Sequence, residues 1–288
     1  MQGAAGAGLT IVGAVLTAIA LNASQGGSAA PKGDLAEIGE ARAGTVTVAI
    51  PQTISDIVIA EARAPGRPIV LIDPGHGGRD PGAPTVSGST TEKVLTLAMA
   101  RELRDLLARR GRVRVALTRD DDRYLTLDQR AALAGRIGAS LYLSLHMDSA
   151  PNPLARGGTV YSLSDVASDA EAARLAGREN GAAGAGRVVD GSVEAMLNDL
   201  ALREQMTASA ELASRLVRKA QGRVHLRPEP HRFALFHVLK AAEVPAVLFE
   251  AGYVSNAEDE LSLTTVAGRA KTVAALADAV EADVAVRR

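Results

Sequence analysis

Two histidines and a glutamate stand in this sequence directly after largely apolar runs. His76 lies in the turn DPGHGG after the run at 69–72, His146 follows the run at 141–145, and Glu250 follows the run at 247–249. Such runs indicate strands buried on both faces, and open α/β sheets bind ligands at the carboxyl ends of their strands. We therefore expect these three side chains at the rim of one active site.

These residue types are also those of a catalytic metal site. Zinc in enzymes commonly takes three protein ligands, often two His and one Glu, and keeps a fourth position for water. The chain has no Cys, so His, Asp and Glu are the side chains able to hold a transition metal. His76, His146 and Glu92, which stands at an expected helix start, can supply such a set. Their separations, 16 residues from 76 to 92 and 54 from 92 to 146, are by themselves only a weak signal.

Apolar and amphipathic segments alternate from Pro68 onward. The expected strands are 69–73, 112–118, 140–146, 158–163, one near 236–239, and 246–250. The expected helices are 91–110, 127–137, two or three between 168 and 221, and 265–284. This order predicts an α/β fold in which a mostly parallel twisted sheet is flanked by helices on both faces. The zinc site would lie at the carboxyl ends of the strands, and a helical insertion would occupy about 165–207.

The amino-terminal part has a different character. Residues 9–21 are apolar, and no charged side chain precedes Lys32, so we expect 1–30 to be a signal peptide or a membrane anchor. A buried helix is the alternative, and the absence of Lys or Arg before the apolar run departs from a normal signal peptide. Residues 31–65 are expected to form a linker, and 66–288 the catalytic domain.

The overall charge argues against a nucleic-acid partner. The chain has 32 basic and 33 acidic residues, a formal net charge of −1, and 2% aromatic residues. It therefore has neither the overall field that attracts phosphate backbones nor the aromatic platforms on which bases stack.

Six motifs, in order along the chain, resemble those of zinc-dependent N-acetylmuramoyl-L-alanine amidases, which are bacterial cell-separation hydrolases. They are DPGHGG at 73–78, Glu92, LTRDDDRYLTL at 117–127, SLHMDSA at 144–150, GTVYSLSD at 158–165 and VLFEAGYVSN at 247–256. The resemblance runs from about 68 to 285. One departure is Met147-Asp148, where many members carry Ala followed by Asn or Asp.

The resemblance implies one zinc ion per chain, held by His76, Glu92 and His146, with Glu250 as the catalytic glutamate. The implied reaction is hydrolysis of the amide between N-acetylmuramic acid and the L-alanine of the peptidoglycan stem peptide. The implied setting is cell-wall remodelling and daughter-cell separation in the periplasm, with membrane contact only through the amino-terminal segment. We also expect Asp73 and Asp148 to orient the histidine rings, although an Asp beside a glycine-rich turn often caps its own backbone.

The insertion resembles that of cell-division amidases in which a helix blocks the zinc site until a protein activator displaces it. Glu179 is the expected blocking acid, with Glu171 second, and a solvated charged face is the alternative for either residue. Arg232 is a candidate for holding the muropeptide. Two rival functions are a zinc exopeptidase-like hydrolase acting on free peptides and a wall-binding protein without catalysis.

Overall fold

The computed structural model describes residues 57–181 and 193–287. The predicted leader and the predicted linker up to residue 56 lie outside these residues. Among the helices that are described, none combines the length and the apolar character needed to cross a membrane.

The described residues form one seven-stranded sheet with the strand order β1-β3-β2-β4-β7-β5-β6. The strands are β1 (Ile59–Ala60), β2 (Ile69–Pro74), β3 (Arg114–Leu117), β4 (Ala139–Asp148), β5 (Gly158–Leu163), β6 (Leu226–Ala234) and β7 (Ala246–Tyr253). Four adjacent strands, β3, β2, β4 and β7, are parallel to one another. β1 is antiparallel to β3, and β5, which is parallel to β6, is antiparallel to β7. The prediction of a mostly parallel sheet is confirmed.

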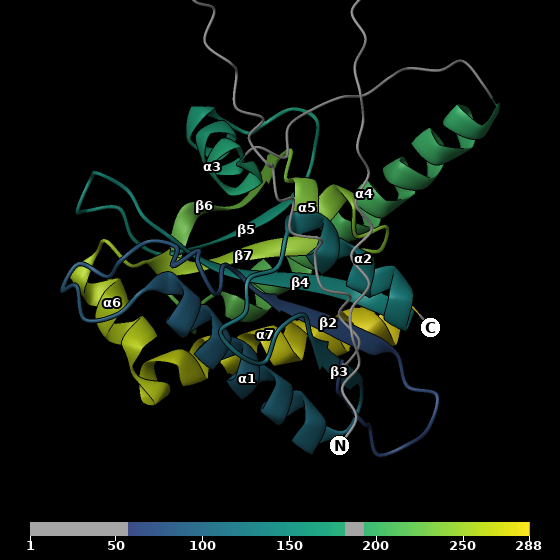
Figure 1. Ribbon diagram of the computed structural model, residues 1–288, viewed down its shortest axis with the longest axis horizontal. Helices are drawn as coiled ribbons and strands as arrows, with labels where there is room; N and C mark the ends of the chain where they lie inside the picture. Colours follow the sequence, from purple (N-terminus) through teal and green to yellow (C-terminus); the bar gives the residue numbers. More distant parts are fainter. Residues whose placement is uncertain (1–56, 182–192, 288) are drawn as a thin grey trace, which may run out of the picture. The chain divides into compact units, whose positions relative to one another are not determined.

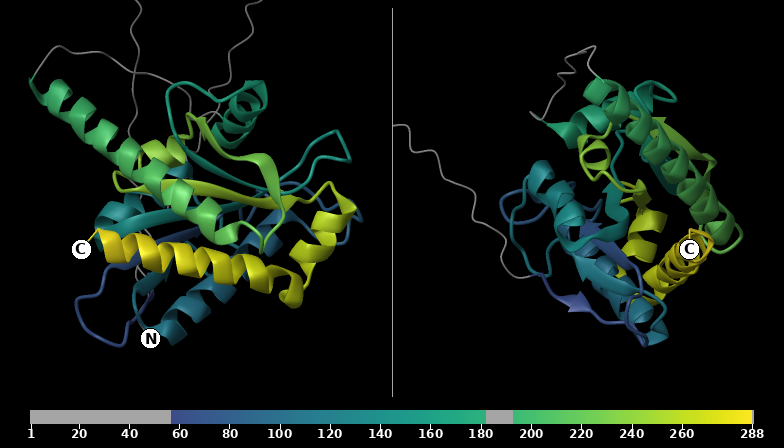
Figure 2. Two further views of the ribbon diagram at one scale, coloured as in Figure 1. Left: turned by 180° about the vertical axis from the view of Figure 1, so that it is seen from behind. Right: turned by 90° about the vertical axis from the view of Figure 1, so that its right-hand side faces the viewer.

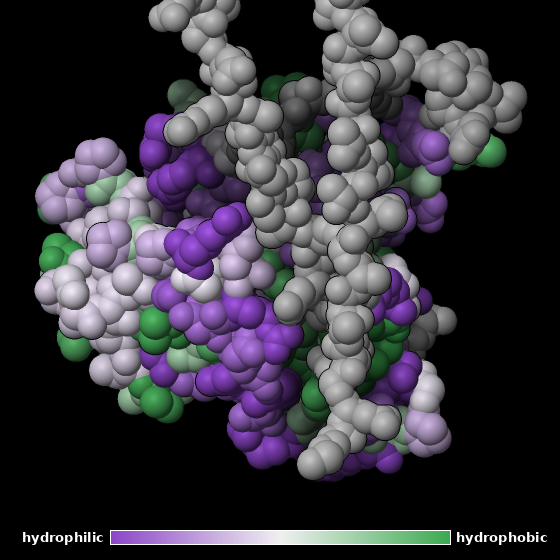
Figure 3. Space-filling model, in the orientation of Figure 1, coloured by the Kyte–Doolittle hydropathy of each residue, from purple (hydrophilic) through white to green (hydrophobic). Residues whose placement is uncertain are grey.

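Helices cover both faces of the sheet, as predicted (Figures 1 and 2). One apolar core lies between the sheet and α1 (Glu92–Arg110), α4 (Val193–Ala220) and α7 (Val266–Val286). A second core lies between the opposite face and α2 (Leu127–Ile137), α3 (Ala170–Asn180) and α5 (His237–Lys240). The short α6 (Ala257–Thr264) follows β7. The surface over α1 is largely hydrophilic in Figure 3, which agrees with its single buried face.

The ends of α1 and α2 lie within a residue of their predicted positions because the sequence carries clear stop signals. Gly111 and Gly138 follow the two helices in the left-handed conformation that glycine adopts easily. Thr126 and Gln129 form a reciprocal capping box at the start of α2.

The region after residue 207 differs from the prediction in three respects. Residues 237–240 form the short helix α5 rather than a strand, and the edge strand β6 was not predicted. β6 contains Pro228 and Pro230, which interrupt the pattern of a strand and are tolerated mainly at sheet edges. α4 continues through residue 207, so no element ends at the predicted limit of the insertion.

Candidate active site

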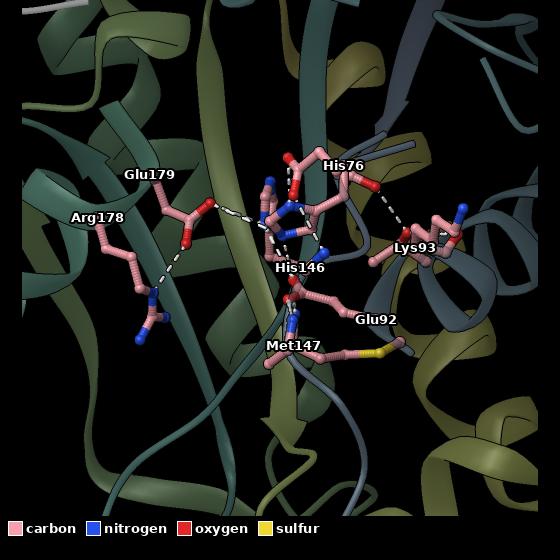
Figure 4. A network of polar contacts seen from close by, with 12 residues as sticks. His76, Glu92, Lys93, His146, Met147, Arg178 and Glu179 are labelled. Carbon is pink, nitrogen blue, oxygen red and sulfur yellow. Dashed lines mark hydrogen bonds and ion pairs between the residues drawn. The ribbon is translucent and has the colours of Figure 1, made fainter. Parts of the chain in front are cut away.

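The predicted site residues converge at the carboxyl ends of β2, β4 and β7. His76 lies in the turn after β2, His146 lies near the end of β4, and Glu92 is the first residue of α1. In the sheet register His146 is paired with Glu250 on the neighbouring strand β7. In Figure 4 the side chains of His76, His146 and Glu92 point toward one another. The sheet thus brings together four residues whose first and last members, His76 and Glu250, are 174 positions apart in the sequence.

The two histidines and Glu92 have the spacing of metal ligands. Oε1 of Glu92 lies 3.0 Å from Nε2 of His76 and 3.1 Å from Nδ1 of His146. Ligand atoms about 2.0–2.2 Å from a tetrahedral zinc ion are about 3.3 Å from one another. Nδ1 of His76 contacts Asp80, whereas its buried Nε2 faces the carboxylates of Glu92 and Glu179 without meeting hydrogen-bond geometry within the described residues. Nε2 is therefore the ring nitrogen that is placed to bind a metal ion. The donor set therefore fits zinc.

The groups around the ligands hold them in place. Oδ2 of Asp80 lies 2.9 Å from Nδ1 of His76, a carboxylate–histidine pair of the kind that fixes the ring of a metal ligand. The backbone N–H of Ala83 donates to Oε2 of Glu92, and that of Met147 donates to Oε1. Asp80 was not predicted from the sequence. Its position four residues after His76, across a glycine-rich turn, was the available signal.

The backbone of the turn after β2 is adapted to the close approach of the two histidines. A Cβ atom on Gly75 would lie 2.4 Å from Cε1 of His146. Gly82 has φ +65°, and a Cβ atom there would lie 2.7 Å from both Oε2 of Glu92 and Cδ2 of His76. His76 itself has φ 60°, which is unusual for a residue with a side chain. The guanidinium of Arg130 donates to the carbonyl oxygens of Pro74 and His76 and so supports this conformation.

Asp73 and Asp148 have partners other than the histidine rings. Within the described residues, the carboxylate of Asp73 pairs with Arg130 at 2.8 Å and accepts hydrogen bonds from the hydroxyls of Thr118 and Ser144. Asp148 accepts from the guanidinium of Arg178 at 3.1 Å. These contacts correct the expectation that the two aspartates orient the histidines. Asp73 pairs with Arg130, which in turn donates hydrogen bonds to the turn after β2. The position beside the ring of His76 that was expected for Asp73 is occupied by Asp80.

Changing Asp73 to Asn should lower the free energy of unfolding by about 3–5 kcal/mol at pH 7, because Arg130 would keep a buried charge without its partner. Burial alone would raise the pKa of Asp73, but the charge of Arg130 and the hydroxyl hydrogen bonds lower it to about 2. This contribution is therefore present above pH 4 and is lost as the pH falls toward 2. Urea unfolding of the parent and the variant should show a difference that shrinks over that range. The exposed Asp105→Asn is the control, and a difference independent of pH would contradict the assignment.

Glu250 is a buried carboxyl group without a partner. It is 1% exposed, and neither carboxylate oxygen has a hydrogen-bond partner within the described part of the chain. Burial raises its pKa well above the ordinary value, and the nearby charges of Asp148, Glu92 and Glu179 raise it further. An unsatisfied buried carboxyl group costs stability and is retained where it has a function.

Of the two acids on α3 that were predicted to block the metal site, Glu179 lies next to the histidines. Oε2 of Glu179 lies 3.4 Å from Nδ1 of His146 and 3.9 Å from Nε2 of His76, and the three side chains could share one metal ion. Figure 4 shows Glu179 directed at the rings from α3. Beside it opens a cavity of about 370 Å³ whose lining includes both histidines and Tyr124.

Glu171, at the other end of α3, lies away from the histidines and pairs with Arg227 and Arg232. This corrects the expectation that Glu171 is a second blocking acid at the metal site. Arg232 also pairs with Asp169, so its guanidinium is engaged by α3 in this structure. Its role in holding substrate stays a prediction.

Comparisons with known proteins point to one enzyme family. The sequence profile of the N-acetylmuramoyl-L-alanine amidase family matches residues 70–282. N-acetylmuramoyl-L-alanine amidase AmiA from Escherichia coli (strain K12) is 37% identical over 220 residues, which cover 75% of this chain and 75% of that protein.

Two solved structures share the fold. The catalytic domain of CwlV, an N-acetylmuramoyl-L-alanine amidase from Bacillus (Paenibacillus) polymyxa var. colistinus, has a TM-score of 0.53 and 26% identity, covering 74% of this chain and 96% of that one. The CwlD amidase from Clostridioides difficile, solved in complex with the GerS lipoprotein, has a TM-score of 0.53 and 23% identity, covering 76% of this chain and 99% of that one. The profile match and the identity to AmiA show that this chain belongs to the N-acetylmuramoyl-L-alanine amidase family.

Proposed function

We propose that the protein is a zinc-dependent amidase that hydrolyses the amide between N-acetylmuramic acid and the L-alanine of the peptidoglycan stem peptide. The observation that carries this proposal is the convergence of His76, Glu92 and His146 next to a buried carboxyl group without a partner, Glu250. Membership of the amidase family supports the same bond and the same polymer. Cell-wall remodelling, daughter-cell separation and a periplasmic location are part of the proposal.

The chemistry divides between the metal ligands and Glu250. Zinc bound by the three ligands would lower the pKa of a water molecule to about 7 and polarise the amide carbonyl. Glu250 accepts the proton of the attacking water and delivers it to the departing amine of L-alanine. Burial raises the pKa of Glu250 and so favours the protonated acid that serves the second step, whereas the positive charge of bound zinc would favour the carboxylate that serves the first. Asp80 keeps the ring of His76 in position throughout.

We further propose that α3 keeps the enzyme inactive until it is displaced. The carboxylate of Glu179 faces the nitrogens of both histidines and would occupy the position that the attacking water needs. Neighbouring residues fix the end of the helix over the site. Arg178 donates to the carboxylate of Asp148 and the carbonyl of Ser149, and Asn180 donates to the carbonyl of Leu235 at 2.7 Å.

A protein activator is the partner that would displace α3. α4 follows α3 along the chain, and its first turns carry Met196, Leu197 and Leu200, each more than 60% exposed. These three side chains lie at helical spacing, so they form one apolar ridge of the kind that inserts into a groove of a partner. A partner bound there would hold the helix that comes next after α3 along the chain.

Changing Glu179 to Ala should raise the basal rate of peptidoglycan hydrolysis by at least about tenfold, because the loss of a charged contact of this kind corresponds to about 1.5–3 kcal/mol. Dye release from labelled, purified peptidoglycan by the full chain measures the rate. Glu204→Ala, an exposed substitution on α4, is the matched control and should leave the rate unchanged. Equal rates for parent, control and Glu179→Ala would remove the blocking role.

The reaction itself is tested by digesting purified peptidoglycan with the full-length Glu179→Ala protein and measuring product masses. We expect intact stem peptides with a free L-alanine amino group and glycan strands that have lost them. Trimmed stem peptides that remain attached to the glycan would indicate an exopeptidase. A folded protein that binds the polymer but releases nothing would indicate a wall-binding protein.

A further inference from the structure

The carboxylate of Glu171 lies in a binding site made of two arginines and a tyrosine. Nη1 and Nη2 of Arg227 donate to its two oxygens at 2.7 and 2.9 Å, so the contact is a two-pronged fork. Arg232 donates at 3.2 Å and the hydroxyl of Tyr253 at 3.0 Å. Paired parallel hydrogen bonds from a guanidinium are the geometry by which proteins recognise a carboxylate.

Within the described residues, Arg227 and Arg232 form ion pairs only with carboxylates of α3 and of its N-cap. Glu171 lies in the first turn of the helix, and the N-cap Asp169 pairs with Nη2 of Arg232 at 3.2 Å. The side chains of Arg227 and Arg232 are only 19% and 10% exposed. Displacement of α3 would therefore remove both acids together and leave two closely spaced cations on β6 without a counter-charge, which is unfavourable unless another anion takes their place.

The site lies at a definite distance from the reaction centre. One face of α3 carries Glu171, Leu175 and Glu179, because residues four apart lie on the same side of a helix. The buried side chain of Leu175 directs that face at the sheet. At about 1.5 Å per residue, the eight residues from Glu171 to Glu179 span about 12 Å. An extended peptide covers that distance in about three to four residues. The strand β7 connects the two places, because it carries both Glu250 and Tyr253.

We propose that Arg227, Arg232 and Tyr253 form a subsite for a free carboxylate on the peptide part of the substrate, and that Glu171 occupies this subsite while α3 is in place. The proposal rests on the amidase function proposed above. One helix then imitates the substrate at two points, with Glu179 at the metal ligands and Glu171 at the carboxylate subsite. The sugar part of the substrate offers hydroxyl and acetamido groups without charge, so the peptide is the part that can supply the anion.

The test uses synthetic N-acetylmuramoyl tetrapeptides in which each free carboxylate in turn is replaced by a carboxamide. The enzyme is the full chain with Glu171→Gln and Glu179→Ala, which frees both places. We expect one of these replacements to raise KM by about tenfold or more, the effect of losing a charge-assisted hydrogen bond, with a much smaller change in kcat. Arg227→Gln and Arg232→Gln, each added to this enzyme, should raise KM for the acid substrate and remove the difference between acid and amide.

The matched control is Arg223→Gln, since Arg223 pairs with Asp278 and is absent from the site. It should leave both KM and the preference for the acid unchanged. If every tetrapeptide is hydrolysed with the same KM, the subsite is overturned while the proposed amidase function still stands. This comparison uses only the Glu171→Gln, Glu179→Ala enzyme, so it does not depend on whether the arginine variants fold. Failure of the enzyme to hydrolyse any of the substrates would contradict the amidase function and the subsite with it.

Discussion

Glu250→Gln is expected to lower the rate of peptidoglycan hydrolysis by about 10²–10⁴-fold, the range typical for loss of a general acid–base group. The amide of Gln has nearly the same shape as the carboxyl group but cannot accept a proton from water. Glu250 is not among the three side chains that would hold zinc, so the zinc content per chain should not change. Metal analysis and rates measured in the Glu179→Ala background would show both results.

The same substitution should not destabilise the protein, which separates a catalytic role from a structural one. Glu250 is buried, and its oxygens have no hydrogen-bond partner within the described residues. Gln carries no charge, so it adds no repulsion toward the three neighbouring acids, and the carboxyl group that it replaces has no hydrogen bond to lose. Thermal unfolding should therefore occur at the same or a higher temperature. A variant that keeps its activity, or that loses activity only because it unfolds, would contradict the assignment.

His146→Ala is expected to abolish zinc binding and, with it, activity. Its ring supplies one of the three expected ligand atoms and lies 3.1 Å from Oε1 of Glu92. Substitutions that are merely adjacent to a metal site already reduce metal affinity by about 10–100-fold. Loss of a ligand itself should exceed that range. After dialysis against a weak chelator, the parent should retain about one zinc ion per chain and the variant almost none.

His237→Ala is the matched control for this experiment. His237 lies on α5, where its Nε2 contacts Asp128 at 2.6 Å, and we assign it no role in metal binding. Its zinc content should equal that of the parent. Full retention of zinc by His146→Ala would contradict the ligand set, whereas loss of zinc by His237→Ala would show that the measurement reports general unfolding.

The convergence of the three expected ligands could be predicted because each of them is coupled to a local sequence signal. His76 and His146 each follow an apolar run, and Glu92 stands at a helix start, so a parallel sheet was bound to bring the two histidines to the same edge. The surrounding contacts carried no such signal. Asp80 reaches His76 only because the turn has an unusual backbone, which a sequence pattern does not reveal.

The contrast between Glu171 and Glu179 shows where prediction from sequence ended. Both acids lie on the same face of α3, so periodicity could not distinguish their roles. Their partners differ because β6 passes beneath one end of the helix and supplies Arg227 and Arg232. That strand contains two prolines and was not predicted, so the arginine contacts could not be anticipated either.

Anomalous X-ray diffraction at the zinc absorption edge, from crystals of the full-length parent protein, would test the central claim most directly. We predict a single zinc ion per chain bound by His76, Glu92 and His146, with the carboxylate of Glu179 as its fourth ligand. A zinc-loaded protein whose only anomalous peak lies away from these side chains would contradict the account.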